Sequence, residues 1–138
     1  MALQCFDGRV YAVDKNEEAA ELTRQNAYKF GCDNIEIISG TAPETLCGFP
    51  APDKVFIGGS CGKISEILNI VYEKNSKADV VITAVSLETL NEAINSFAYF
   101  GIDSPEIVQI AVTRTRKLGN HTMLSAENPI FIMKGVRA

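Results

Sequence analysis

Asp14 is the residue whose type and position most clearly suggest chemistry. It follows an apolar run at residues 10–13 that is typical of a buried strand. In doubly wound α/β folds, ligands bind beyond the carboxyl ends of the strands, and an acid after the second strand hydrogen-bonds ribose hydroxyls. Asp14 and its neighbour Lys15 are therefore predicted to bind the ribose of a cofactor. The alternative is a solvated acid that leads into a helix.

A second candidate segment follows the next predicted strand. Gly40, Thr41, Ala42 and Pro43 are small or rigid, so a flat adenine ring has room to lie against the backbone. Pro43 also restricts how the following turn begins. Thr41, Ala42 and Pro43 are predicted to bind the cofactor beside Asp14, although an ordinary strand-to-helix turn has a similar composition.

A third candidate is the glycine-rich turn at Gly58, Gly59 and Ser60. Glycines let a backbone approach a ligand closely, and successive amides in such a turn can hold an anion. The turn is not a phosphate-binding loop, because Ile64 stands where that motif requires Ser or Thr. The nearby thiol of Cys61 has no histidine or other general base visible near it in the sequence, so we interpret it as incidental. The turn is predicted to bind substrate.

Late in the chain, Arg114, Arg116 and Lys117 place three cations within four positions. Arginine binds carboxylates through two parallel hydrogen bonds, so an acidic small molecule is one candidate ligand and a solvated loop is the alternative. His121 is the single histidine, and it is grouped with the substrate-binding candidates. No multi-histidine metal site is expected, and no catalytic acid or base is identified.

The bulk properties exclude several classes of protein. With 138 residues, 46% of them hydrophobic, the chain is predicted to form one domain spanning residues 1–138. A net charge of −4 argues against nucleic-acid binding. The four cysteines lie far apart, which favours free thiols in a reducing compartment. No apolar run approaches the roughly 20 residues of a membrane span, so a soluble cytoplasmic protein is predicted.

The first predicted helix has clear boundaries. Asn16 is a typical N-cap, and Gly31 is a typical stop signal. Ala19, Leu22 and Phe30 fall on one stripe at helical spacing, which predicts the face that packs on the sheet.

The order of strands and helices predicts an α/β fold. Continuous apolar strands separated by helical patterns indicate a parallel sheet covered on both faces. The last two strands are separated only by a polar loop, which favours a terminal antiparallel pair. By analogy of fold, this arrangement is typical of class I S-adenosylmethionine-dependent methyltransferases. The expected strands are residues 10–13, 35–38, 55–57, 80–85, 107–113 and 130–133, and the later helices are residues 64–72 and 87–100.

Taken together, several segments resemble the decarboxylating precorrin and cobalt-precorrin methyltransferases of cobalamin biosynthesis. This resemblance implies S-adenosyl-L-methionine as methyl donor, methylation at carbon-15 of a tetrapyrrole, and loss of carbon dioxide from its ring-C acetate. It places the ribose at Asp14 and the adenine at Ala42, and it offers substrate carboxylates as partners for the basic residues near Arg114. The segments are VYAVDKNEEA at 10–19, GTAPE at 40–44, FIGGS at 56–60, GNHTML at 119–124 and NPIF at 128–131.

The resemblance also implies a departure. The family's first strand and glycine-rich turn would precede residues 2–6, so an N-terminally truncated chain is expected, with residues 1–5 as the tail of a helix. The absent strand would lie between the strands at 10–13 and 55–57. We therefore expect poor cofactor binding and little activity unless roughly 30–50 upstream residues are restored, about the size of a strand-turn-helix unit.

Partners and alternatives follow from the same resemblance. A tetrapyrrole substrate is expected, together with a homo-oligomer or a fused or associated second precorrin methyltransferase domain. Whether the substrate already carries cobalt is left open. Two alternatives remain: a related methyltransferase acting on RNA or another small molecule, and a folded but inactive fragment.

Overall fold

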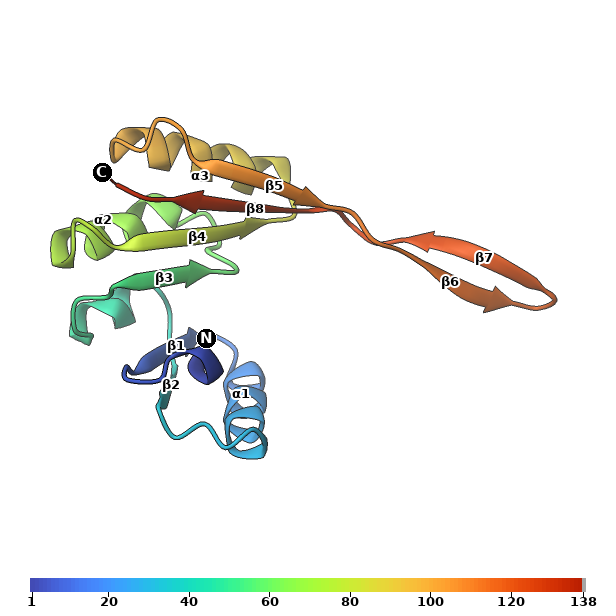
Figure 1. Cartoon of the computed structure of the whole chain (residues 1–138), viewed down its shortest axis with the longest axis horizontal. Helices are drawn as coiled ribbons and strands as arrows, with labels where there is room; N and C mark the ends of the chain where they lie inside the picture. Colours follow the sequence, from blue (N-terminus) through green and yellow to red (C-terminus); the bar gives the residue numbers. More distant parts are fainter. Residues whose placement is uncertain (138) are drawn as a thin grey trace. The chain divides into compact units, whose positions relative to one another are not determined.

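The chain forms two compact units, Met1–Pro50 and Ala51–Ala138, in a computed structural model that describes residues 1–137 (Figure 1). The first unit holds one sheet and the second unit holds two, and no strand of one unit pairs with a strand of the other within those residues. The predicted single domain across residues 1–138 stays a prediction. None of the helices in residues 1–137 has the length and apolar character needed to cross a membrane.

The first unit is built on a parallel strand pair. β1 (Val10–Asp14) and β2 (Ile35–Ser39) pair from Val10↔Ile35 to Asp14↔Ser39, connected by α1 (Glu17–Lys29). Both predicted strands are confirmed, each with one further residue at its carboxyl end. Two short 3-10 helices, η1 (Ala2–Gln4) and η2 (Glu44–Gly48), flank them.

The boundaries of α1 are as predicted, but its packing face is not. The side chain of Asn16 accepts hydrogen bonds from the amides of Glu18 and Ala19, and Gly31 follows the helix at φ +64°. The predicted packing stripe is wrong, because Leu22 and Phe30 are exposed. The inward stripe is rotated by one residue: Ala20 is buried and Thr23 and Ala27 are half-buried, at i, i+3 and i+7.

The second unit has a mixed four-stranded sheet in the order β3-β4-β8-β5. β3 and β4 are parallel, and β8 is antiparallel to both β4 and β5. This confirms the predicted change from a parallel sheet to a terminal antiparallel pair. The elements are β3 (Lys54–Ile57), α2 (Ile64–Lys74), β4 (Asp79–Ala84), α3 (Leu87–Tyr99), β5 (Glu106–Ile110), β6 (Thr113–Leu118), β7 (His121–Ala126) and β8 (Ile130–Gly135).

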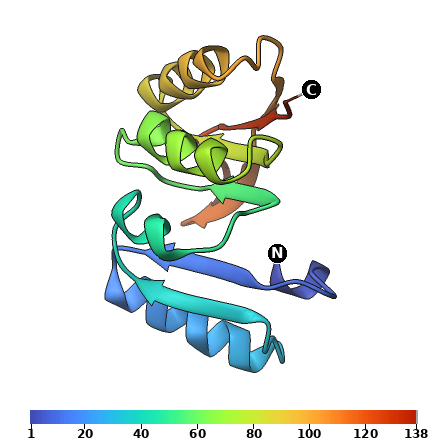
Figure 2. The same cartoon turned by 90° about the vertical axis from the view of Figure 1, so that its left-hand side faces the viewer.

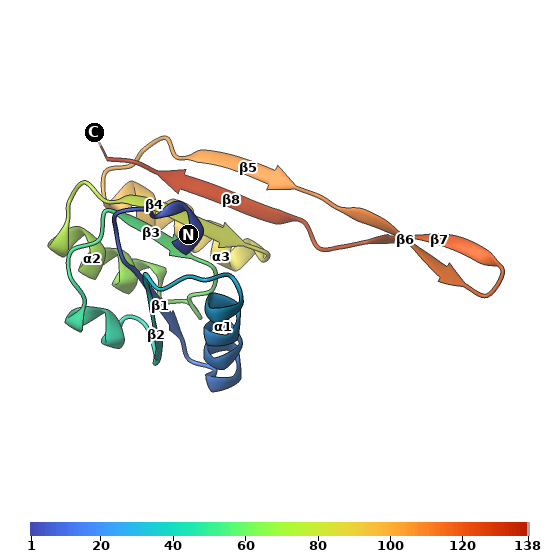
Figure 3. The same cartoon turned by 60° about the horizontal axis from the view of Figure 1, so that its bottom comes forward.

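The core of this unit lies between the sheet and two helices. α2 and α3 pack side by side on one face of the sheet (Figures 2 and 3). A Cβ on Gly135 of β8 would lie 2.5 Å from the ring of Phe97, so glycine is required where β8 passes this buried ring. The largest fully buried side chains are Phe97, Ile64, Leu68, Ile82, Met133 and Val80.

The sequence predicted a sheet covered on both faces, but the opposite face of this sheet carries exposed apolar side chains. Phe56, Val108 and Ile110 remain exposed there. They share a face because Phe56 pairs with Val81 on β4 and Val108 pairs with Ile132 on β8. The alternating burial of β4, in which every second residue is buried, reflects this one-sided packing.

The segment predicted as a polar loop is a β-hairpin, so that prediction is wrong. β5 ends at Ile110 instead of continuing to Thr113, and β6 pairs with β7 from Thr113↔Ala126 to Leu118↔His121 (Figure 1). Gly119 has φ +59° at the first position of the two-residue turn, as a type II′ turn requires. The Gly119-Asn120 pair between two six-residue strands is the sequence signal that was missed.

Candidate cofactor and substrate site

Asp14 lies at the exposed carboxyl end of β1, where its backbone and side chain are both held in place. Its carbonyl accepts a hydrogen bond from the amide of Gly40 at 2.9 Å, which ties the ends of β1 and β2 together. Its Oδ1 accepts from the amide of Asn16 at 2.9 Å, so the side chain is fixed by the turn into α1. The carboxylate is thus oriented at the sheet edge where ligands bind in such folds. Lys15 is exposed beside it.

A second acid lies at the same end of the first unit. The pKa of the Glu17 carboxyl lies below its ordinary value, first because of a hydrogen bond with the side chain of Ser39 and second because of Arg24. Arg24 approaches Glu17 at 3.3 Å and Glu21 at 3.1 Å. Ser39 was not among the sequence candidates. The sequence feature that could have identified Ser39 is its position as a polar residue at the end of β2, directly opposite Asp14.

The predicted adenine segment forms a tight turn after β2. The side chain and the amide of Thr45 both hydrogen-bond the carbonyl of Thr41, at 2.9 and 3.0 Å. A Cβ on Gly40 would collide with the hydroxyl of Thr45, so any residue other than glycine would have to displace that side chain. Thr41 is exposed, Ala42 is half-buried and Pro43 is buried, and the Ala42–Pro43 bond is cis. The surface available to a ligand is therefore Thr41 and Ala42.

The glycine-rich turn lies between β3 and α2 in the second unit. Gly58 and Gly59 are exposed, whereas Ser60 is 8% exposed and its hydroxyl has no hydrogen-bond partner among residues 1–137. Cys61 at φ 52° and Gly62 at φ 79° reverse the chain before α2. The ligand-accessible part of this turn is the backbone of Gly58 and Gly59.

The basic residues lie on the exposed β6–β7 hairpin, and the structure divides them between two faces. Alternation along β6 puts Arg114 and Arg116 on one face and Lys117 on the other. His121 shares the face of the two arginines, because it pairs with Leu118. The Nε of Arg114 bonds Glu127 Oε1 at 2.7 Å. Arg116 and His121 are therefore the basic groups of that face without an acidic partner in residues 1–137.

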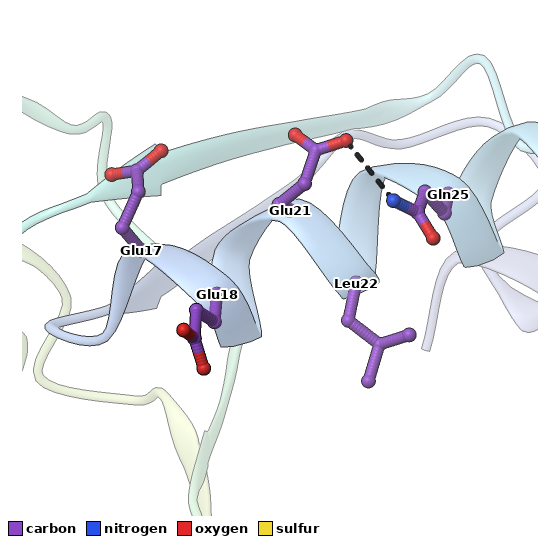
Figure 4. A pocket seen from close by; sticks show the side chains of 5 residues that line it. All are labelled: Glu17, Glu18, Glu21, Leu22 and Gln25. Carbon is purple, nitrogen blue, oxygen red and sulfur yellow. Dashed lines mark hydrogen bonds between the residues drawn. The ribbon is translucent and has the colours of Figure 1, made fainter.

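Two shallow surface hollows lie elsewhere. One follows the exposed side of α1 and is lined by Glu17, Glu18, Glu21, Leu22 and Gln25, with the amide of Gln25 donating to Glu21 at 3.4 Å (Figure 4). All five side chains come from one helix, so the hollow is a surface feature without enclosing walls. The other runs between α2 and α3 and includes Glu92 and Tyr99. Neither hollow contains a residue predicted to bind cofactor or substrate.

The side chains offer no metal site within the part of the chain that the structure describes. No group of three or more His, Cys, Asp or Glu residues is close enough to hold an ion there. Cys5, Cys32, Cys47 and Cys61 form no disulfide within the described residues.

The structure thus brings the cofactor candidates together in one unit. Asp14 and the turn at residues 40–43 meet through the 2.9 Å bond between the Asp14 carbonyl and the Gly40 amide. The substrate candidates all lie in the second unit, on the turn after β3 and on the hairpin.

Comparison with known proteins identifies the family of the chain. The family model for the precorrin methyltransferase domain matches residues 2–137. The chain belongs to the precorrin methyltransferase domain family. Among solved structures, precorrin-8W decarboxylase from Methanobacterium thermoautotrophicum superposes with a TM-score of 0.81 at 36% identity, covering 92% of this chain and 69% of that one.

Two curated relatives are both named probable cobalt-precorrin-6B C(15)-methyltransferase (decarboxylating). The one from Saccharolobus solfataricus is 41% identical over 131 residues, covering 93% of this chain and 66% of its own length. The one from Pyrobaculum calidifontis is 39% identical over 126 residues, covering 91% of this chain and 64% of its own length. This precorrin methyltransferase domain therefore spans just under two thirds of the length of these relatives.

A more distant structure shows the fold alone. An S-adenosylmethionine-dependent O-methyltransferase from Thermotoga maritima matches at 15% identity with a TM-score of 0.64, covering 95% of this chain and 51% of its own. Together with the precorrin methyltransferases, it establishes the class I methyltransferase fold that the sequence predicts.

Proposed function

We propose that the protein containing residues 1–138 methylates carbon-15 of a precorrin or cobalt-precorrin and removes carbon dioxide from the ring-C acetate. The observation that carries this proposal is the 41% identity, across 93% of the chain, to a relative named for that activity. Agreement of the fold, with a TM-score of 0.81 to a precorrin decarboxylase, supports it independently of residue identity.

S-adenosyl-L-methionine is the methyl donor in this proposal, and the exposed residues of the first unit suit it. The oriented carboxylate of Asp14 accepts hydrogen bonds from ribose hydroxyls, beside Lys15. Thr41 and Ala42 provide the small, accessible surface for the adenine, and the buried Pro43 holds their turn in shape. When bound, the cofactor supplies the methyl group from its sulfonium.

The second unit binds the tetrapyrrole. The exposed backbone of Gly58 and Gly59 allows close approach of a flat ring, and the carbonyl of the buried Ser60 accepts a hydrogen bond from the amide of Lys63 at 3.1 Å within the turn. Arg116 and His121 meet substrate carboxylates on one face of the hairpin, with Arg114 shared between substrate and Glu127. The protein contributes by aligning the substrate with the cofactor and by excluding water. No side chain is assigned as a catalytic acid or base.

We place this protein in the cytoplasm, where its four cysteines, which form no disulfide in residues 1–137, stay reduced. A second precorrin methyltransferase domain, fused or associated, is the partner in this proposal.

The decisive experiment follows both products of the proposed reaction. Cobalt-precorrin-6B is supplied with methyl-labelled cofactor, and labelled tetrapyrrole and released carbon dioxide are counted. One methyl transferred per carbon dioxide released is expected. Methylation without carbon dioxide would contradict the decarboxylating step, and transfer to RNA instead would replace the proposal.

A binding experiment tests the cofactor site separately. In a protein that also carries the family's upstream strand and glycine-rich turn, Asp14→Ala should weaken cofactor binding, measured by calorimetry, by about 1.5–3 kcal/mol, the scale of hydrogen bonds to a charged group. Asp33→Ala is the matched control, because Asp33 is an exposed acid of the same unit that precedes β2 instead of following a strand. Equal affinities for the Asp14 variant and the unaltered protein would remove Asp14 from the site.

A further inference from the structure

The glycine-rich turn between β3 and α2 has little in its own sequence to fix its shape. Gly58 and Gly59 have no side chains to restrict their backbone, and the hydroxyl of Ser60 has no hydrogen-bond partner among residues 1–137. Cys61 adopts φ 52°, a conformation that is unfavourable for a residue with a side chain. Contacts from outside the turn are therefore needed to hold it in one conformation.

Two such contacts come from the next strand and helix in the chain, β4 and α3. At the start of the turn, the hydroxyl of Thr83 on β4 donates to the carbonyl of Ile57 at 3.5 Å. At its end, the carboxylate of Glu92 on α3 accepts from the amide of Ile64 at 2.8 Å. Residues 58–63 thus lie between two anchor points, each made by a residue far away in sequence.

Glu92 is the stronger of these two anchors. Its bond to Ile64 is the shorter one, and a charged acceptor makes a hydrogen bond roughly twice as strong as a neutral one. Ile64 is fully buried and Glu92 is half-buried, which strengthens the bond further. Lys63 makes no side-chain cap at the start of α2, so the position where this helix begins depends on the carboxylate from α3.

We propose that Glu92 is a positioning residue for the tetrapyrrole: it holds the start of α2, and with it the backbone of Gly58 and Gly59, in the conformation that the substrate binds. This inference rests on the proposed function, in which the turn contacts the tetrapyrrole. Glu92 acts through Ile64 and not through contact with the substrate. Without its carboxylate the turn populates other conformations, and the apparent affinity falls with the fraction that remains competent to bind.

Two substitutions of Glu92 test this role in a protein that also carries the family's upstream strand and glycine-rich turn. Glu92→Ala removes the acceptor, whereas Glu92→Gln keeps an acceptor oxygen. Titration with cobalt-precorrin-6B, followed by its absorbance, gives the dissociation constant. Glu92→Ala should raise it about five-fold, the factor that corresponds to one helix cap, and Glu92→Gln about two-fold or less. KM should rise with it while kcat changes little.

Cofactor affinity provides an internal comparison. The residues predicted to bind the cofactor lie in the other unit of the chain. Calorimetry should therefore give cofactor dissociation constants within about two-fold of the parent for both variants, because distant sites behave independently. Equal losses for cofactor and tetrapyrrole in Glu92→Ala would overturn the proposal.

Two control variants separate positioning from charge and from stability. Glu88→Ala removes the same charge one turn earlier on α3, where the side chain is exposed. Asn75→Ala acts at the opposite end of α2, where the side chain donates to the carbonyl of Pro52 at 2.9 Å and accepts from the amide of Lys77 at 3.0 Å. Both should leave tetrapyrrole affinity within about two-fold. A loss in either control as large as in Glu92→Ala would overturn the proposal.

Hydrogen exchange follows the turn directly, without substrate. In Glu92→Ala, amides of the peptide covering residues 58–64 should exchange faster than in the parent, and those of β4 should not change. Weaker tetrapyrrole binding without faster exchange would mean that Glu92 contacts the substrate itself, which overturns the positioning role. Unchanged tetrapyrrole affinity would overturn this inference and leave the proposed function standing. A parent protein that does not bind cobalt-precorrin-6B would overturn both.

Discussion

The amide of Ile64, the first residue of α2, donates a hydrogen bond to Oε1 of Glu92 on α3 at 2.8 Å. Lys63 precedes α2 and makes no side-chain cap, so the carboxylate of the neighbouring helix acts as the cap instead. Its negative charge also lies at the positive end of the α2 dipole. One contact thus joins the two helices that cover the sheet of the second unit.

Removing this cap should lower stability. Glu92→Ala is expected to reduce the free energy of unfolding by about 1 kcal/mol, the usual value of an N-cap, and Glu92→Gln by less because an acceptor oxygen remains. Urea denaturation followed by circular dichroism measures both. Asn91→Ala, at the exposed neighbouring position, serves as control. A loss in that control as large as in Glu92→Ala would show that the cap is not the cause.

Replacing Tyr72 with phenylalanine should make the protein more stable. Its hydroxyl is buried with no hydrogen-bond partner among residues 1–137, while its ring contacts Phe100 with centroids 5.2 Å apart. Tyr72→Phe keeps the ring and removes the unsatisfied group, so the free energy of unfolding should rise by about 1 kcal/mol. Tyr99→Phe changes an exposed hydroxyl and should have little effect. A Tyr72→Phe variant less stable than the parent would indicate a partner for the hydroxyl.

The same residue predicts how stability changes in alkaline solution. Burial raises the pKa of Tyr72 above its ordinary value of 10.0. As the pH rises through 10.0, the unfolded chain therefore loses this proton before the folded one, and stability falls. Below that pH the contribution is fully present. Tyr72→Phe should remove this part of the alkaline decline, which thermal melts at increasing pH would reveal.

The contact between Ser39 and Glu17 should be visible in the titration of Glu17. Ser39→Ala is expected to raise the pKa of Glu17 toward its ordinary 4.5, and Arg24→Gln should do so by less. A lowered pKa in the folded state means that the contribution to stability is present above 4.5 and is lost as the pH falls through the folded value. Carboxyl chemical shifts in NMR measure this. No change in either variant would argue against the contact.

The division of the basic residues between two hairpin faces predicts a difference between neighbours in sequence. Arg116→Gln should weaken tetrapyrrole binding by roughly ten-fold or more, because a charge-assisted hydrogen bond is lost. Lys117→Gln, on the opposite face, should change it little. The Arg116 effect should shrink as salt rises, while cofactor affinity stays constant. Equal losses for both variants would remove the arginine face as the substrate contact.

The sequence by itself determined most elements of this protein and the family to which it belongs. The Asn16 cap and the Gly31 stop were readable because they depend on groups within a few residues of each other. The strands were readable because each is a short apolar run bounded by turn residues. Asp14 and the turn at residues 40–43 were recognisable as neighbours because parallel strands end at the same edge of a sheet.

Only the tertiary structure decided which side chains face the core and which contacts join distant segments. The packing stripe of α1 shifted by one residue, from Ala19 and Leu22 to Ala20 and Thr23, because packing against the neighbouring strands determines the inward face and apolar spacing alone does not. Glu92 became a cap through a contact 28 residues away in sequence. Lys117 and Arg116 lie on opposite faces of the hairpin, because successive side chains of a strand point to opposite faces whatever their charge.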